Sequence, residues 1–171
     1  MDPRIWKFDD TYYNELRLGM LTVVDSKIST SSNKKFRIRM LTEKGSGGPP
    51  KASVIKKIYV DFFDKSPGKE IATVELNLDG RSLFTNVTSG EDHALIESTN
   101  VHLTTGSSFN FKKIGKSMNI ITDFGVEVTV QLPLTYMRVF IRVPYAQYFD
   151  NVEGVCGHID YENDRHACTE N

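Results

Sequence analysis

Hydrophobic and polar residues alternate most regularly in a stretch near the C-terminus. In residues 126–132 every second residue is apolar, and residues 137–143 repeat the pattern. A period of two is typical of a strand that buries one face and exposes the other. The alternation predicts that the core includes Val126, Val128, Val130, Val139 and Ile141.

Shorter segments of the same kind fill the rest of the chain. The first follows Pro3, which disfavours an interior strand position and predicts an edge strand around Ile5, Trp6 and Phe8. Further strands are expected at 17–25, 35–41, 54–63, 71–78, 82–87, 94–103 and 109–114. The one helix candidate is Pro144–Phe149, because proline is favoured in a first helical turn. About ten short strands at regular spacing predict an all-β fold, an antiparallel β-sandwich.

Composition changes this picture little. The 171 residues are enough for a single domain spanning 1–171, and 39% hydrophobic with 25% charged residues is ordinary for a globular protein. The formal charge of -1, from 21 basic and 22 acidic residues, does not favour nucleic acid as a partner. No apolar run reaches the length of a membrane span, and the N-terminus has no basic-then-apolar start of a signal peptide.

The two C-terminal strands lead to a loop rich in oxygen-bearing side chains. Asp160, Glu162, Asn163 and Asp164 fall within five positions. Calcium prefers six to eight oxygen ligands from carboxylates, amides and backbone carbonyls. The spacing is not that of a helix–loop–helix calcium site, so this loop is either a calcium site of another type or a solvated acidic turn.

Two cysteines flank this loop. Cys156 and Cys168 predict a local disulfide in an oxidising compartment, or one cysteine that pairs elsewhere. His158 and His166 lie between them, so a zinc site from two cysteines and two histidines is the alternative. The spacing is unlike that of the common zinc sites, which favours the disulfide.

Other motifs give weaker signals. Asn86-Val-Thr88 is an N-glycosylation sequon, which is typical of secreted proteins. No nucleophile motif, phosphate-binding glycine loop or zinc-protease motif occurs, so a non-enzymatic protein is expected. Four outward arginines are interpreted as solvated strand faces rather than a basic stripe: Arg37, Arg39, Arg138 and Arg142.

Together these motifs resemble the von Willebrand factor type D domain. The family opens with Gly-Asp-Pro-His, a spacer and Thr-Phe-Asp-Gly, and here Asp2-Pro-Arg precedes Lys7-Phe-Asp-Asp. The family closes with two apolar strands, Gly-Leu-Cys-Gly-Asn and an Asn/Asp-rich loop. Here those strands are followed by Gly154-Val-Cys-Gly-His158 and the acidic loop. The resemblance extends from Asp2 to Asp164.

The chain departs from the family pattern at several positions. Met1, Arg4 and His158 replace the usual Gly, His and Asn, and Glu153 replaces the first cysteine of Cys-Gly-Leu-Cys. These changes argue against a thiol-exchange role and against self-cleavage after Asp2. The cysteine-poor pattern is similar to type D modules of mosaic cell-surface proteins. Arg142-Val-Pro also resembles the partial module of repulsive guidance molecules.

The resemblance implies a β-sandwich with Ca²⁺ held by Asp160, Glu162, Asn163 and Asp164, and with Asp2 near the same end. It implies a non-enzymatic extracellular binding or structural module of a larger secreted or cell-surface glycoprotein. Adhesion, matrix assembly and ligand capture are the expected roles, with protein partners or neighbouring domains of the parent chain. The alternatives are a module of a lipid-transport or yolk protein and a signalling ligand like the repulsive guidance molecules.

Overall fold

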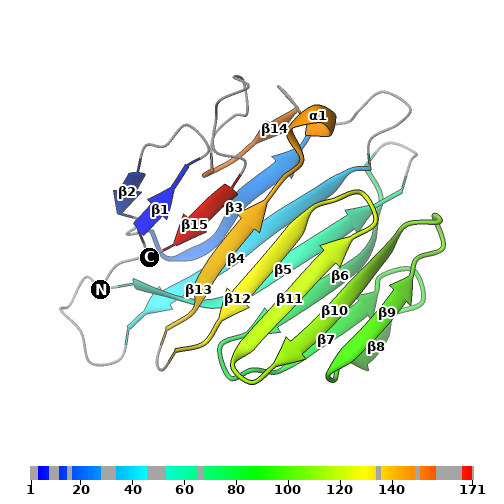
Figure 1. Cartoon of the computed structure of the whole chain (residues 1–171), viewed down its shortest axis with the longest axis horizontal. Helices are drawn as coiled ribbons and strands as arrows, with labels where there is room; N and C mark the ends of the chain where they lie inside the picture. Colours follow the sequence, from blue (N-terminus) through cyan, green and yellow to red (C-terminus); the bar gives the residue numbers. More distant parts are fainter. Residues whose placement is uncertain are drawn as a thin grey trace.

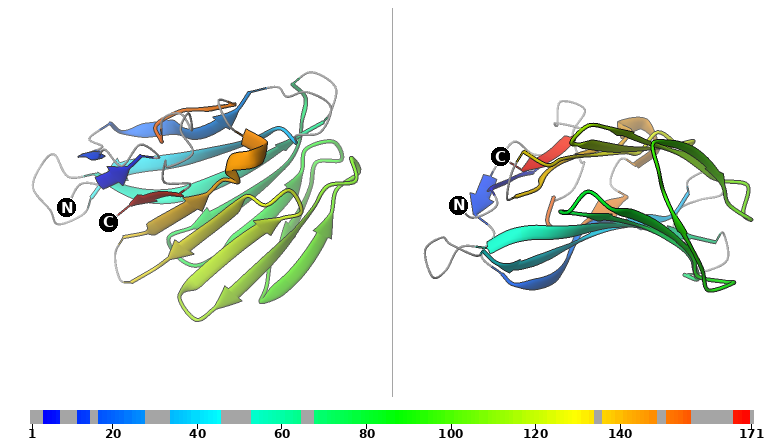
Figure 2. Two further views of the ribbon diagram at one scale, coloured as in Figure 1. Left: turned by 45° about the horizontal axis from the view of Figure 1, so that its top comes forward. Right: turned by 90° about the horizontal axis from the view of Figure 1, so that it is seen from below.

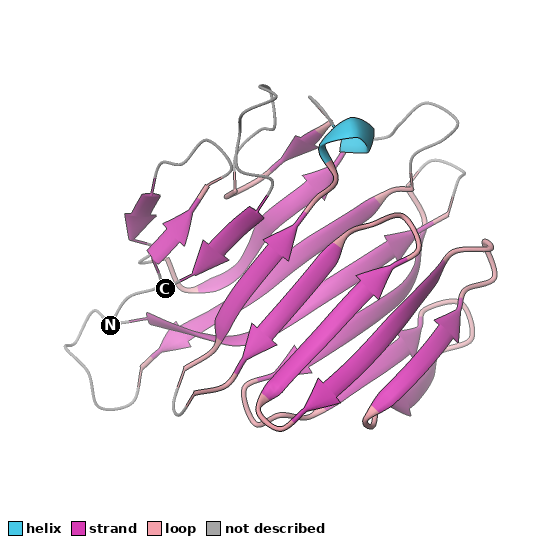
Figure 3. Cartoon of the chain, viewed as in Figure 1, coloured by secondary structure: helices cyan, strands magenta, loops and turns pink. Residues whose placement is uncertain are grey.

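Two antiparallel sheets lie face to face in the computed structural model (Figures 1 and 2). The structure describes residues 4–7, 12–14, 17–27, 34–45, 53–64, 68–133, 136–148, 151–156 and 167–170. Strands dominate the described part of the chain (Figure 3). The predicted all-β antiparallel sandwich is therefore confirmed. The described residues form fifteen strands, more than the ten or so that the hydrophobic pattern indicated.

The first sheet has eight strands and carries both ends of the chain. In order across the sheet they are β2 (Tyr12–Asn14), β1 (Arg4–Trp6), β15 (Ala167–Glu170), β13 (Arg138–Arg142), β12 (Glu127–Gln131), β11 (Ser117–Thr122), β10 (Ser108–Ile114) and β9 (Ser98–His102). Strand β1 pairs on both sides, so the predicted edge position of this segment is wrong. Pro3 only has to precede the strand, where its missing N–H costs no ladder hydrogen bond.

The second sheet has seven strands, most of them joined by hairpins. In order they are β14 (Val152–Glu153), β3 (Gly19–Ser26), β4 (Phe36–Lys44), β5 (Ser53–Phe63), β6 (Glu70–Asn77), β7 (Ser82–Asn86) and β8 (Glu91–Ala94). The single strand predicted at 94–103 is instead two elements. The chain leaves β8 at Ala94 and enters β9 at Ser98, so it crosses there from one sheet to the other. Glu97 accommodates the crossing with a φ of 56°.

The core lies between the sheets and follows the predicted alternation. The five predicted core residues are all buried, none more than 5% exposed: Val126, Val128, Val130, Val139 and Ile141. Aromatic rings from both sheets meet there. Phe62 of β5 stacks on Phe109 of β10 with 5.2 Å between ring centroids. Burying such apolar area is the main favourable contribution to folding.

A one-turn helix, α1 (Tyr145–Tyr148), closes one end of the sandwich, inside the segment predicted to be helical. Pro144 precedes it and packs against the β11–β12 hairpin, where a Cβ on Gly125 would lie 2.7 Å from the proline ring. The buried Tyr148 side chain donates a hydrogen bond from its hydroxyl to the Lys34 carbonyl at 2.9 Å. The segment between the sheets is thereby fixed just before the chain enters β14 and the predicted polar loop.

Candidate functional site

The predicted calcium ligands cannot be placed directly. Asp2, Asp160, Glu162, Asn163 and Asp164 all lie outside the described residues. The structure does describe both strands that flank the polar loop. Residues 157–166 connect β14 in the seven-stranded sheet with β15 in the eight-stranded sheet, so the chain crosses the sandwich there.

The start of this loop is anchored tightly to β3. A bulge between Thr22 and Val24 interrupts the β3 register. The N–H groups of Val155 and Cys156 bind the carbonyls of Thr22 and Val23, at 3.1 and 3.0 Å. Gly154 has a φ of +126°, and a Cβ there would lie 2.6 Å from the Val23 carbonyl oxygen. Only glycine fits such a close approach of two backbones.

The end of the loop is held in the sheet between β13 and β1. Cys168 pairs in register with Ile141 of β13. Cys156 is fully buried, and the described part of the chain contains no free cysteine. His158 and His166, the partners in the zinc alternative, lie outside the described residues.

A charged cluster on the outer face of the seven-stranded sheet was not predicted. The Asp61 carboxylate is completely buried there and accepts hydrogen bonds from Arg37 Nε at 2.9 Å and from Arg39 Nε and Nη2 at 2.6 and 2.7 Å. The Thr73 hydroxyl donates to it at 3.0 Å, and Glu70 accepts from Arg37 at 3.0 Å. The bond to Asp61 raises the pKa of Arg39 above its ordinary value.

The four outward arginines lie in two different sheets, and only two of them belong to this cluster. Arg37 and Arg39 belong to β4, whereas Arg138 and Arg142 belong to β13 in the other sheet. The four arginines therefore form no single basic stripe, but Arg37 and Arg39 are not simply solvated as expected, because they bind the buried Asp61 carboxylate. Because Asp61 has both oxygens engaged and no exposure, the cluster stabilises the sheet and offers no free carboxylate to a ligand. Asp61 pairs with Arg37 across adjacent strands, and this register appears only in the structure.

Two acidic residues face each other between β3 and the edge strand β14. Asp25 lies directly opposite Glu153. Asp25 Oδ1 is buried without a hydrogen-bond partner among the described residues. Burial raises the pKa of Asp25 above its usual value, against the lowering influence of Lys35 and Arg37. Two carboxylates make no metal site alone, and the described residues contain no group of three or more His, Cys, Asp or Glu side chains suited to a metal.

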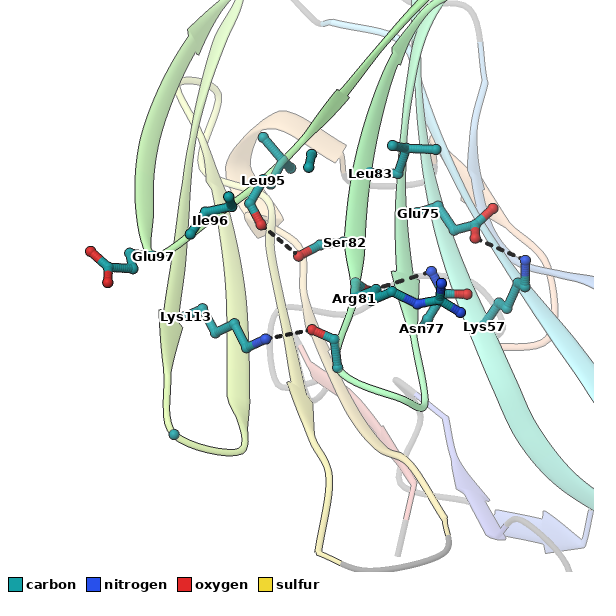
Figure 4. Close-up of a pocket in the computed structure, with 13 residues that line it drawn as sticks. Lys57, Glu75, Asn77, Arg81, Ser82, Leu83, Leu95, Ile96, Glu97 and Lys113 are labelled. Atoms are coloured by element: carbon teal, nitrogen blue, oxygen red, sulfur yellow. Dashed lines mark hydrogen bonds and ion pairs between the residues drawn. The ribbon is translucent and has the colours of Figure 1, made fainter.

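An open pocket of about 700 Å³ lies where the chain crosses from β8 to β9 (Figure 4). Leu95 and Ile96 contribute apolar surface to it. The Lys113 ammonium reaches across from β10 and donates to the Gly80 carbonyl at 2.6 Å, which ties the two sheets together. The other charged side chains are paired or exposed, so the pocket lacks a set of convergent polar groups of the kind that fix a small ligand.

The sequon lies in the turn between β7 and β8. The Asn86 side-chain oxygen accepts hydrogen bonds from the N–H groups of Thr88 and Ser89, at 3.0 and 3.2 Å. Val87, Thr88 and Ser89 are exposed. Asn86 itself is half-buried, and the exposed turn that follows it lies at the surface, where a glycan attachment site is expected.

Comparison with known proteins identifies the domain type. Among the described residues no helix is both long enough and apolar enough to cross a membrane. No significant match to a curated protein was found. The family model of the von Willebrand factor type D domain matches residues 1–171. Domains of this family are modules of larger extracellular proteins, generally with binding or structural rather than enzymatic roles. The chain belongs to the von Willebrand factor type D domain family.

Proposed function

We propose that this domain is a non-enzymatic extracellular module that supports adhesion, matrix assembly or ligand capture within a larger secreted or cell-surface glycoprotein. The observation that carries the proposal is the family match over residues 1–171. Its partners are extracellular proteins or neighbouring domains of the parent chain. The absence of catalytic motifs in the sequence supports a binding role.

Binding to extracellular material tests this role directly. The fluorescently labelled domain, secreted from cultured animal cells, is titrated onto decellularised matrix and onto fixed cell surfaces. Saturable binding that unlabelled domain displaces is expected. A heat-unfolded sample of the same protein is the control. Lack of saturable binding to either material, or hydrolase turnover that Asp160→Ala abolishes, would refute the proposed function.

A Cys156–Cys168 disulfide is part of this proposal. Both flanking strands are fixed, and the buried Cys156 follows β14 by three residues and binds β3 through its N–H group. A bridge that closes a loop of this size stabilises the fold by roughly 3 kcal/mol in the loop-entropy model. Alkylation without reductant followed by mass spectrometry tests it. Two alkylated thiols in protein from the secretory pathway would disprove the bridge.

We also propose that the C-terminal loop binds Ca²⁺ through Asp160, Glu162, Asn163 and Asp164. The donor chemistry fits, since these are the hard oxygen ligands that calcium prefers. Carboxylates this close in sequence repel each other, and a divalent cation cancels that repulsion. The strands on either side of this segment, β14 and β15, belong to different sheets.

Strand direction supports a choice between the N-terminal aspartates as an additional ligand. Strand β1 is antiparallel to β15, with Ile5 opposite Glu170 and Trp6 opposite Thr169. The chain after Trp6 therefore leaves this strand pair at the end where residues 157–166 arrive, and the chain before Arg4 leaves at the other end. This direction favours Asp9 over the Asp2 that the resemblance suggested.

Melting curves in excess EDTA and in millimolar calcium test the site. At about ten times the dissociation constant, calcium adds about 1.4 kcal/mol of stability, or roughly 3–6 °C in Tm for a domain of this size. Asp160→Ala and Asp9→Asn should remove most of this gain, whereas Asp2→Asn should keep it. Coincident wild-type curves would exclude appreciable binding. Loss of the gain in Asp2→Asn alone would restore Asp2 as the ligand.

Glycosylation of Asn86 is the remaining part of the proposal, supported by the exposed turn that carries it. Protein secreted from animal cells should lose mass on treatment with an N-glycosidase. Asn86→Gln should abolish that change, and the neighbouring Ser89→Ala should keep it. A wild-type protein of unmodified mass would show that the sequon is not used.

A further inference from the structure

The two sheets end side by side in edge strands of very different character (Figure 1). Strand β8 ends the seven-stranded sheet and carries the exposed charges of Glu91 and Asp92. Strand β9 ends the eight-stranded sheet and reads Ser-Thr-Asn-Val-His, with no lysine, acid or proline. Charges and proline are the usual protection of an edge against pairing. Strand β9 therefore lacks the protection that β8 has.

The backbone of β9 exposes a regular set of hydrogen-bonding groups. Outside both ends of the β9–β10 ladder, Lys113 N–H binds the Glu97 carbonyl at 2.6 Å and Leu103 N–H binds the Ser107 carbonyl at 2.8 Å. In an antiparallel pair, residues alternate between bonding the neighbour and facing away from it. The residues of β9 whose N–H and C=O groups face away from β10 are therefore Ser98, Asn100 and His102.

The side chains of β9 also suit pairing. Asn110 of β10 donates from its amide nitrogen to Asn100 Oδ1 at 2.7 Å, so the central amide is already oriented by its neighbour. The Asn100 amide nitrogen has no partner among the described residues and can extend this ladder across the edge. On the opposite face, Thr99 and Val101 are half-buried and β-branched, which favours packing against another strand.

We propose that β9 is a self-association edge that pairs antiparallel with β9 of a second copy of this chain. The two-fold axis passes between Asn100 and the partner's Asn100. Ser98 then lies opposite the partner's His102, and each of these pairs exchanges two backbone hydrogen bonds. The two eight-stranded sheets become one continuous sheet, with a ladder of four asparagine amides across its centre.

A second copy is a better occupant than an unrelated strand because β9 is self-complementary. In this register no like charges face each other, and Thr99 lies beside the partner's Val101. The arrangement closes on itself with two-fold symmetry, so it produces a dimer and not a fibre. Two five-residue strands bury less than the roughly 1,000 Å² of a stable interface. The dimer is therefore expected to be weak, with a dissociation constant of about 0.1–1 mM.

Sedimentation velocity of the 171-residue chain from about 10 μM to about 1 mM tests the dimer in that expected range. The wild type should show a concentration-dependent shift from monomer to dimer. Asn100→Lys places two ammonium groups opposite each other and should weaken the dimer at least about tenfold, with little change in Tm because the site is exposed. Ala94→Lys, which adds the same charge to the exposed edge strand β8, is the matched control and should dimerise like wild type.

Amide hydrogen exchange of the wild type locates the interface residue by residue. The N–H groups of Thr99 and Val101 should be protected at every concentration, because they bind β10. Those of Ser98, Asn100 and His102 should gain protection only as the dimer forms. A monomeric wild type at about 1 mM, an unchanged dimer in Asn100→Lys, or exchange at these three amides that does not depend on concentration would each overturn the proposal.

Discussion

Removal of the Asp61 carboxylate should be among the most damaging single changes on the surface of either sheet. Asp61→Ala deletes an acceptor that is 0% exposed and leaves Arg37 and Arg39, which are 27% and 25% exposed, without their common partner. Breaking a buried ion pair in this way costs about 3–5 kcal/mol. Because both arginines keep access to water, we discount the loss to roughly 2–3 kcal/mol.

The loss should appear as a drop of about 5–10 °C in Tm, at roughly 2–4 °C per kcal/mol for a domain of this size. Urea denaturation of wild type and variant gives the free energy of unfolding directly. Asp92→Ala, at an exposed carboxylate that accepts from Thr85 at 2.7 Å, is the control and should change stability by less than about 0.5 kcal/mol. A double-mutant cycle with Arg39→Met then measures the coupling energy.

The result that would refute this reasoning is a change in Asp61→Ala no larger than in Asp92→Ala. Such a result would mean that the arginines recover in water everything they lose from the carboxylate. Two aromatic rings support the expected loss of stability in Asp61→Ala. Arg39 lies over Tyr59 and Arg37 over Phe63, each with its guanidinium carbon 5.1 Å from the ring centroid. These stacked positions restrict the rotation that would bring the guanidinium groups fully into water.

Three other substitutions test different parts of the structure. Val128→Asp buries an unpaired carboxylate at a core position 1% exposed and should unfold the domain; a soluble, cooperatively melting variant would contradict the strand assignment. Gly154→Ala should lower the free energy of unfolding in urea by more than about 2 kcal/mol, because its Cβ meets the Val23 carbonyl. The control, Gly106→Ala, has a φ of +79° in open space and should lower it by only about 1 kcal/mol. Equal losses would show that the backbone at Gly154 shifts to accommodate the Cβ. The raised pKa of Asp25 means that the folded state binds this proton more tightly than the unfolded state, so its contribution to stability falls as pH rises from the unfolded value through the folded value. Asp25→Asn should therefore raise Tm relative to wild type more at pH 7 than near pH 3.5, and a difference independent of pH would contradict the effect of burial.

The alternation of the sequence predicted the sandwich well because the longer central strands each have one buried face. Strands β12 and β13 were placed from periodicity alone, and their apolar residues are buried as expected. The pairing of strands distant in sequence was not predictable in the same way. Strand β1 is flanked by β2 and by β15 from the other end of the chain, and no local pattern records such a partner.

The crossing between the sheets was also not predictable from the local sequence pattern. Residues 94–103 read as one strand because apolar residues recur through them, but the chain turns at Leu95 to Glu97. The turn uses a left-handed conformation at Glu97, a residue type with no preference for it, so composition gave no signal. Lys113 N–H stabilises the end of the crossing by binding the Glu97 carbonyl, and that contact exists only once β9 has paired with β10.

The anchoring of the polar loop follows from residues that the sequence motif contains, although their reason appears only in three dimensions. Gly154 precedes the Cys156 motif because the backbone must approach β3 within contact distance. That approach fixes the two N–H groups that bind the bulged strand, and β15 fixes the other end of the loop between β1 and β13. Closing a segment whose two ends are already held costs less conformational entropy than closing one whose ends are free. The proposed disulfide and the proposed calcium site would restrain the same segment, so loss of either should weaken the other.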